Sequence, residues 1–250
     1  MDLIIDTPDG TVLAAHWARP ATSGVAPGLV LCHDFPTPPR GSLASGLTFP
    51  ELADRIAAEG GWRVLTFNFR GTGGSHGDFS IHGWEADLRF AVDQVAADAD
   101  GGDGDVWVVG TGVGGALALG VGARDPRVRG IAALGAPVDL RDWARDAQRF
   151  ARHCRTMGVF ESDDAPVDQG AWARELAAVD AVTSARRFAP RPLLLIHGTD
   201  DDVVPVTDAE RLAAAHGHAE LRVVTNGGRR LRHDPRAVAL LLGWLDRQEV

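Results

Sequence analysis

Short apolar runs alternate with longer amphipathic segments along most of the 250-residue chain. Runs of this kind, nearly continuous in aliphatic residues, are typical of strands that are buried on both faces of a parallel sheet. At the start of the chain, the two short runs Leu3–Ile5 and Val12–Trp17 lie on either side of the turn sequence Pro8-Asp9-Gly10 and predict an antiparallel hairpin. The predicted strands are Leu3–Ile5, Val12–Trp17, Leu29–Cys32, Arg63–Phe67, Val106–Val109, Val128–Leu134, Leu193–Ile196 and Leu221–Val224.

The segments between these strands carry apolar residues at helical spacing. They predict helices over Phe49–Glu59, Trp84–Ala97, Val113–Ala123 and Pro235–Trp244. An antiparallel start followed by alternation of strand and helix predicts an α/β fold with a mostly parallel, doubly wound sheet. From Leu140 to about Arg187 no strand pattern occurs and several aromatic residues fall at helical spacing. We interpret this segment as a small helical cap inserted into a single domain that spans residues 1–250.

Composition narrows the class of partner and location. The formal charge of −9 and the pI of about 5.4 argue against a nucleic-acid or anionic-membrane surface, and favour a small-molecule substrate or ligand. Neither a leader pattern nor an apolar run long enough to span a bilayer is evident, which predicts a cytoplasmic protein. The sequence does not indicate an oligomeric state.

Residue usage also excludes some chemistry. All 25 basic residues are Arg and Tyr is absent, which rules out a lysine Schiff base and a tyrosine general acid. The two cysteines, Cys32 and Cys154, form no disulfide framework, and no His, Asp or Glu cluster has metal-ligand spacing. We therefore expect no metal and no other cofactor.

Three motifs, in this order and at this spacing, carry a family resemblance. They are Asn68-Phe69-Arg70-Gly71-Thr72-Gly73-Gly74-Ser75, Val108-Val109-Gly110-Thr111-Gly112-Val113-Gly114-Gly115 and His197-Gly198-Thr199-Asp200-Asp201-Asp202-Val203-Val204-Pro205. Over nearly its whole length the chain resembles the α/β-hydrolase superfamily, specifically its bacterial lysophospholipase- and dienelactone-hydrolase-like members. The resemblance implies the α/β-hydrolase fold and a Ser-His-Asp catalytic triad.

The nucleophile position departs from that family. In G-x-S-x-G, a strand turns sharply into a helix and exposes the serine hydroxyl. Aligning Gly110 and Gly114 with the two motif glycines puts Gly112 where the serine belongs. Glycine has no atom with which to attack a carbonyl, so nucleophilic catalysis from this position is excluded. Thr111 lies one residue early, and we expect its side chain to point away from the pocket, although it stays a pocket candidate.

The acid position is retained, whereas the base position is altered. Counting from Gly198 selects Asp201 as the triad acid. In the loop after the last strand, Arg229 is the best match to the catalytic histidine, and it cannot act as a general base near neutral pH. It is instead able to form a bidentate pair with Asp201. His233, four residues later, stays a catalytic candidate beside its simpler interpretation as a surface or capping residue.

The loop after Cys32 also differs from the family pattern. The family commonly has His-Gly followed by an apolar residue whose N–H helps to bind an oxyanion, and this chain has His33-Asp34-Phe35. The N–H groups of Phe35 and Val113 remain the expected oxyanion-hole donors. Asp34 adds a carboxylate beside that hole, either as a catalytic group facing Gly112 or in an ion pair with an arginine such as Arg70 or Arg229. His33 and His153, the latter on the predicted cap, are further pocket candidates.

Three functions are consistent with these departures. The first is an enzyme without a serine nucleophile, a lyase, isomerase or cyclase acting on a small carbonyl or acyl compound by acid–base and electrostatic catalysis, with Asp34, Asp201 and Arg229. The second is a catalytically dead relative that binds a small ligand or a partner. The third is a residual hydrolase that uses an activated water. Dinucleotide binding by the glycine-rich turn is a weaker alternative, because that turn follows the fifth strand rather than the first.

Overall fold

One eight-stranded sheet organises the chain, and its strand order is β1-β2-β4-β3-β5-β6-β7-β8. The computed structural model describes residues 1–21, 26–38, 41–99 and 104–248. β1 pairs with β2 and β2 with β4 in antiparallel fashion, and every other pairing is parallel, so the predicted α/β fold with a mostly parallel sheet is confirmed. The strands are β1 (Asp2–Asp6), β2 (Val12–Ala18), β3 (Gly28–Cys32), β4 (Arg63–Phe67), β5 (Val106–Thr111), β6 (Val128–Leu134), β7 (Leu193–Gly198) and β8 (Glu220–Val224).

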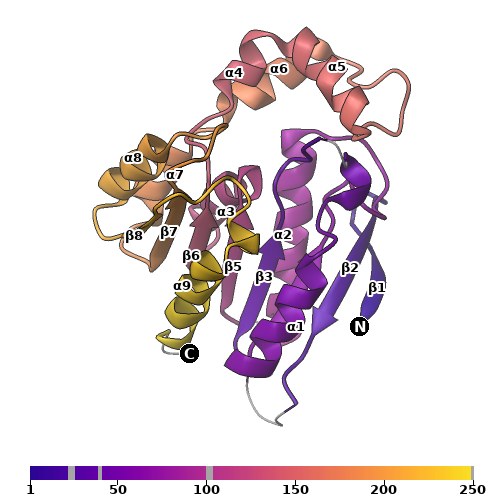
Figure 1. The fold of residues 1–250 in the computed structure, drawn as a ribbon. Coiled ribbons are helices and arrows are strands. Elements are labelled where there is room, and N and C mark those ends of the chain that lie inside the picture. The colour runs from indigo at the N-terminus through magenta and orange to yellow at the C-terminus, as the bar shows by residue number, and fades with distance from the viewer. Residues whose placement is uncertain (22–25, 39–40, 100–103, 249–250) are drawn as a thin grey trace.

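The two faces of the sheet bury separate apolar clusters, because successive strand residues point to opposite sides. On β3, Leu29 and Leu31 pack with α1 (Phe49–Gly60) and α9 (Pro235–Asp246). Val30 and Cys32 pack on the other face, which α2 (Ile81–Ala97), α3 (Val113–Gly122), α7 (Ala181–Phe188) and α8 (Val206–His216) cover. The sheet is therefore sandwiched between helical layers (Figure 1).

α2 starts three residues before its predicted beginning. The side chain of Ser80 accepts a hydrogen bond from the Gly83 N–H at 2.9 Å and caps the helix. Gly83 interrupts the apolar pattern at this end, which is why the pattern alone places the start at Trp84.

Three helices of the predicted insertion lie beyond the carboxyl ends of the strands (Figure 1). They are α4 (Arg141–Arg145), α5 (Ala147–Met157) and α6 (Gln169–Ala178). α7, which the predicted segment also includes, instead packs its buried Phe188 close to Gly122 of α3, in the layer that covers the sheet. No helix in the described part of the chain combines the length and the apolar character needed to cross a membrane.

A buried ion pair fixes the loop after β4 to α2. The Asp87 side chain is 0% exposed, and its carboxylate accepts hydrogen bonds from the Arg70 N–H at 2.9 Å and from Arg70 Nη2 at 2.6 Å. The Trp84 indole N–H donates to the Arg70 carbonyl at 3.0 Å. Phe69 of the same loop donates its N–H to His33 Nε2 at 3.1 Å, so the Arg70–Asp87 pair also helps to position the loop after β3.

We expect Asp87→Ala to lower the free energy of unfolding by about 3 kcal/mol, because it leaves the Arg70 guanidinium partly buried without its main partner. Asp93→Ala is the matched control in the same helix. Its carboxylate is 54% exposed and pairs with Arg127 at the surface, so it should cost less than about 1 kcal/mol. Denaturant unfolding measures both values, and equal losses would contradict a special role for the buried pair.

Candidate functional site

The site begins at the turn between β5 and α3, where Gly112 adopts φ 50° and ψ −122°. A side chain is disfavoured in this conformation. The turn also lies very close to the end of β3, since a Cβ added at Gly114 would overlap the carbonyl oxygen of His33. The local sequence thus brings the loop after β3 onto the turn that carries the nucleophile in the resembling family.

Asp34 occupies the space beside Gly112. Its Oδ1 accepts hydrogen bonds from the N–H of Phe35 at 2.7 Å and from the N–H of Val113 at 2.8 Å. A Cβ added at Gly112 would overlap Oδ1, Cγ and Oδ2 of Asp34. One carboxylate therefore fills the position of the missing nucleophile side chain and engages both N–H groups expected to form the oxyanion hole.

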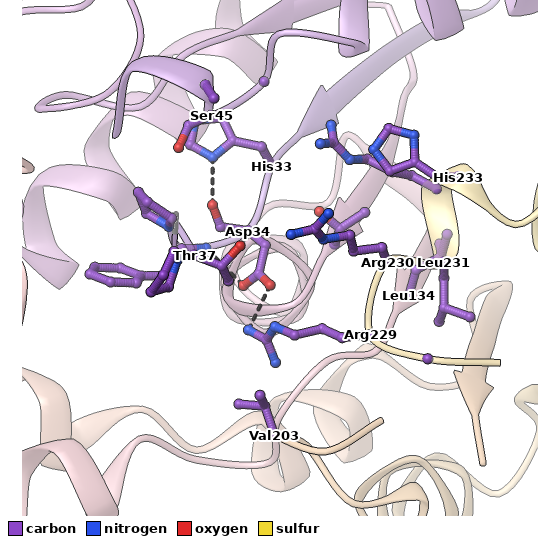
Figure 2. A pocket seen from close by; sticks show the side chains of 18 of the residues that line it. His33, Asp34, Thr37, Ser45, Leu134, Val203, Arg229, Arg230, Leu231 and His233 are labelled. Atoms are coloured by element: carbon purple, nitrogen blue, oxygen red, sulfur yellow. Dashed lines mark hydrogen bonds and ion pairs between the residues drawn. The ribbon is translucent and has the colours of Figure 1, made fainter. Parts of the chain in front are cut away.

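Arg229 is the counterion of Asp34. Its Nη2 lies 2.6 Å from Asp34 Oδ2, and the two side chains are 14% and 21% exposed. Figure 2 shows this pair and the contact of His33 with the Asp34 backbone. The other candidate arginine, Arg70, is committed to Asp87 and Asp9. Burial raises the pKa of the Asp34 carboxyl, while the Arg229 charge and the two N–H donors act in the opposite direction.

The expected pairing of Arg229 with Asp201 is wrong. Asp201 Oδ1 accepts from the N–H groups of Val203 at 3.0 Å and Val204 at 2.9 Å, and its side chain is fully buried. Among the described residues, Asp201 Oδ2 has no hydrogen-bond partner, with His197 Nε2 3.8 Å away, and Nε and Nη1 of Arg229 have none either. Arg229 pairs with Asp34, so both Arg229 and Asp201 keep buried polar atoms that are normally satisfied.

His33 holds the backbone that presents Asp34. Its Nε2 accepts the Phe69 N–H at 3.1 Å, so its Nδ1 carries the proton and donates to the Asp34 carbonyl at 2.7 Å. Burial lowers the pKa of His33 to about 4, which keeps the ring neutral at pH 7. This geometry makes His33 a positioning residue for Asp34.

A cavity of about 710 Å³ adjoins the Asp34–Arg229 pair. It lies between the loop after β3, the segment from η1 (Ser42–Ala44) to the start of α1, and the loop that leads into η2 (Leu231–His233). Its apolar wall includes Phe35, Phe49, Leu134, Val203 and Leu231, and its charged wall includes Asp34, Arg229, Arg230, Arg232, Asp200 and Asp202.

The remaining candidates are distributed around this cavity. Thr111 and His233 are both among the residues that line it. That the Thr111 side chain points away from the pocket stays a prediction. His153 on α5 is exposed and is not among the described lining residues. Its ring stacks on Phe35, with centroids 5.9 Å apart, and burial against neighbouring groups lowers its pKa. His153 therefore packs on the oxyanion loop from the cap side.

Several cavity residues escape sequence reasoning. Phe49 and Ser45 come from the segment before α1 and carry no motif. Arg230 and Arg232 stand beside Arg229 in a visible arginine-rich run, and that run is the signal that points to them. Within the described residues, no three His, Cys, Asp or Glu side chains gather closely enough to hold a metal ion.

The contact of Asp34 with Gly112 predicts non-additive stability effects. Gly112→Ala should lower the free energy of unfolding by about 3 kcal/mol, through overlap with Asp34 and through backbone strain. In an Asp34→Gly background the overlap is gone, and the same substitution should cost only about 1 kcal/mol. A double-mutant cycle by denaturant unfolding measures the difference. Equal costs in both backgrounds would show that Asp34 does not occupy this space.

Neutral His33 predicts a loss of stability in acid. Its pKa is depressed from 6.5 to about 4, so its contribution is fully present above pH 6.5 and is lost as the pH falls through about 4. The full effect is roughly 3 kcal/mol. Unfolding free energies measured from pH 7 to pH 4 should fall less steeply for His33→Asn than for the native protein. Val167→Asn, at an exposed position without a titratable group, should keep the native slope; a native slope in His33→Asn would refute the assignment.

Comparisons with known proteins agree with this architecture. The Uncharacterized protein Rv2307c of Mycobacterium tuberculosis (strain ATCC 25618 / H37Rv) is 30% identical over 231 residues, which cover 90% of this chain and 70% of that protein. The α/β hydrolase GrgF from Penicillium sp. sh18 shares the fold with a TM-score of 0.71 at 18% identity, over 99% of this chain and 98% of that chain. A hydrolase from Pseudomonas aeruginosa does so with a TM-score of 0.73 at 17% identity, over 98% of each chain.

At such identities the two solved structures support the fold alone. The model of the Alpha/beta hydrolase family matches residues 29–240, which is most of the chain. Together with the sheet order and the β5–α3 turn, this match shows that the chain belongs to the alpha/beta hydrolase family.

Proposed function

We propose that this protein binds a small molecule in the cavity beside Asp34 and does not hydrolyse it through an acyl-enzyme. The observation that carries the proposal is the Asp34 carboxylate, which lies in the nucleophile space, accepts both oxyanion-hole N–H groups and pairs with Arg229 at the base position. The nucleophile space, both expected oxyanion-hole donors and the base position are thus engaged in one internal interaction, which leaves out only the acid position, Asp201.

The energetic consequence is large. Loss of a single oxyanion-hole donor lowers kcat by about 10²- to 10³-fold in serine hydrolases. Here a carboxylate engages both donors, and its negative charge opposes the charge that develops on a substrate oxygen. No hydroxyl stands at Gly112 to attack, and Arg229 does not accept a proton near neutral pH.

The cavity supports the binding half of the proposal. Its volume of about 710 Å³ falls within the range of about 300–1,000 Å³ typical of small-molecule sites. Aromatic and aliphatic side chains form much of the wall, and a few charged groups converge on it, which is the usual composition of such sites.

A second candidate is an enzyme that uses Asp34 as a general base. Asp34 lines the cavity, its side chain is 21% exposed, and burial raises the pKa of its carboxyl, which makes the carboxylate a stronger base. Arg229 would stabilise its anion. This candidate ranks second because Asp34 already accepts two N–H groups and an ion pair.

Ester hydrolysis tests the first half of the proposal. The native protein should not turn over p-nitrophenyl acetate or butyrate above the buffer rate. Asp34→Gly/Gly112→Ser/Arg229→His frees the hole and restores a nucleophile and a base, so it should gain measurable turnover. Gly112→Ser/Arg229→His, which keeps Asp34, is the matched control and should gain less. Native turnover that Asp34→Asn abolishes would overturn the proposal in favour of Asp34 catalysis.

Fluorescence of the neutral apolar dye N-phenyl-1-naphthylamine tests the second half. The native protein should enhance it saturably. Ala44→Trp, which fills the cavity from the η1 segment, should abolish the enhancement while circular dichroism shows an intact fold. Absence of saturable binding to the native protein, or its persistence in Ala44→Trp, would refute ligand binding in this cavity.

A further inference from the structure

The loop before α9 presents three arginines to the cavity, namely Arg229, Arg230 and Arg232. Arg229 is neutralised by Asp34. Arg230 differs, because its guanidinium has no hydrogen-bond or ion-pair partner among the residues that the structure describes. Figure 2 shows the side chains of Arg229 and Arg230 both extending from this loop towards the Asp34 side of the cavity.

Arg232 adds a second positive charge to the same wall. Its Nη1 donates to Thr48 Oγ1 at 2.8 Å, and its guanidinium lies over the Phe49 ring, 4.9 Å from the centroid. These contacts fix the side chain against the start of α1, and Phe49 itself lines the cavity. The charge of Arg232 also contributes, after burial, to the lowered pKa of His33. A fixed cation therefore lies beside Phe49 in the cavity wall.

Three carboxylates also line the cavity. Asp34 already has its counterion in Arg229. Asp200 and Asp202 belong to the loop after β7. The Asp200 N–H donates to the Gly227 carbonyl at 2.8 Å, and its Oδ1 accepts from Thr199 Oγ1 at 2.8 Å. Among the described residues, neither Asp200 nor Asp202 forms an ion pair with Arg230.

We propose that the ligand of this cavity carries a terminal anionic group, a carboxylate or a phosphate monoester, on a small apolar body. This inference rests on the proposed binding function and deepens it. The Arg230 guanidinium donates to the anion, with Arg232 as the neighbouring charge, since guanidinium groups match the geometry of carboxylates and phosphates. The apolar body lies against Phe49, Leu134 and Leu231.

The net charge of the whole chain is negative, whereas this cavity wall carries arginines. A protein with a formal charge of −9 does not attract small anions by its average field. Two arginines directed into one cavity of an acidic protein therefore indicate local recognition of an anion rather than a general basic surface.

Displacement of N-phenyl-1-naphthylamine by four probes with the same C8 chain tests this inference: octanoate, octyl phosphate, 1-octanol and octylammonium. For the native protein at pH 7.5, one of the two anions should compete at least about tenfold more strongly than octanol. Arg230→Gln should remove that advantage and leave octanol unchanged. Arg186→Gln removes the same charge from an exposed position on α7 and should behave as the native protein.

Each outcome bears on a different statement. The better of octanoate and octyl phosphate identifies the head group. If the dye binds but octanol competes as strongly as the anions, or octylammonium competes best, the anionic ligand is refuted while ligand binding stands. Equal weakening in Arg186→Gln would likewise refute the role of Arg230. If the dye does not bind the native protein saturably, the proposed function itself fails.

Discussion

The Asp34 carboxylate is the interaction on which the rest of the site depends. It joins three elements that are far apart in the sequence: the loop after β3, the N-terminus of α3 through the Val113 N–H, and the loop before α9 through Arg229. A carboxylate is well matched to this place, because it accepts the Val113 N–H at the start of α3 and the Phe35 N–H of the loop after β3, and a helix N-terminus stabilises negative charge.

The same contacts link Asp34, Gly112 and Arg229, the three positions at which the sequence analysis expects departures from the family pattern. Asp34 needs a neighbour without a side chain, and Gly112 provides it. The buried carboxylate is stabilised by a permanent cation, which arginine supplies and histidine does not near pH 7. Each of the three residues thus supports a contact that another one makes.

The sequence predicted the fold well, and it predicted the contacts between the candidate site residues less well. The apolar pattern predicted the parallel sheet because a strand that is buried on both faces is apolar at nearly every position. It also indicated that Asp34 would meet either Gly112 or an arginine, and the structure shows both. Whether Arg229 pairs with Asp34 or with Asp201 depends on side-chain torsions, and these cannot be predicted from the spacing of residues along the chain. The cavity wall contributed by Phe49 depends on how α1 packs on the sheet, which no local motif encodes.

Phe35 separates two regions with different physical character. On one side its ring packs with Trp143 and Phe150 of the cap helices, at centroid distances of 5.0 and 5.4 Å. On the other side lies the cavity, and none of the described residues that line it comes from α4, α5 or α6. The described wall of the cavity is therefore built without the cap helices. The cap instead buttresses the Phe35 ring, and through it the backbone whose N–H donates to Asp34.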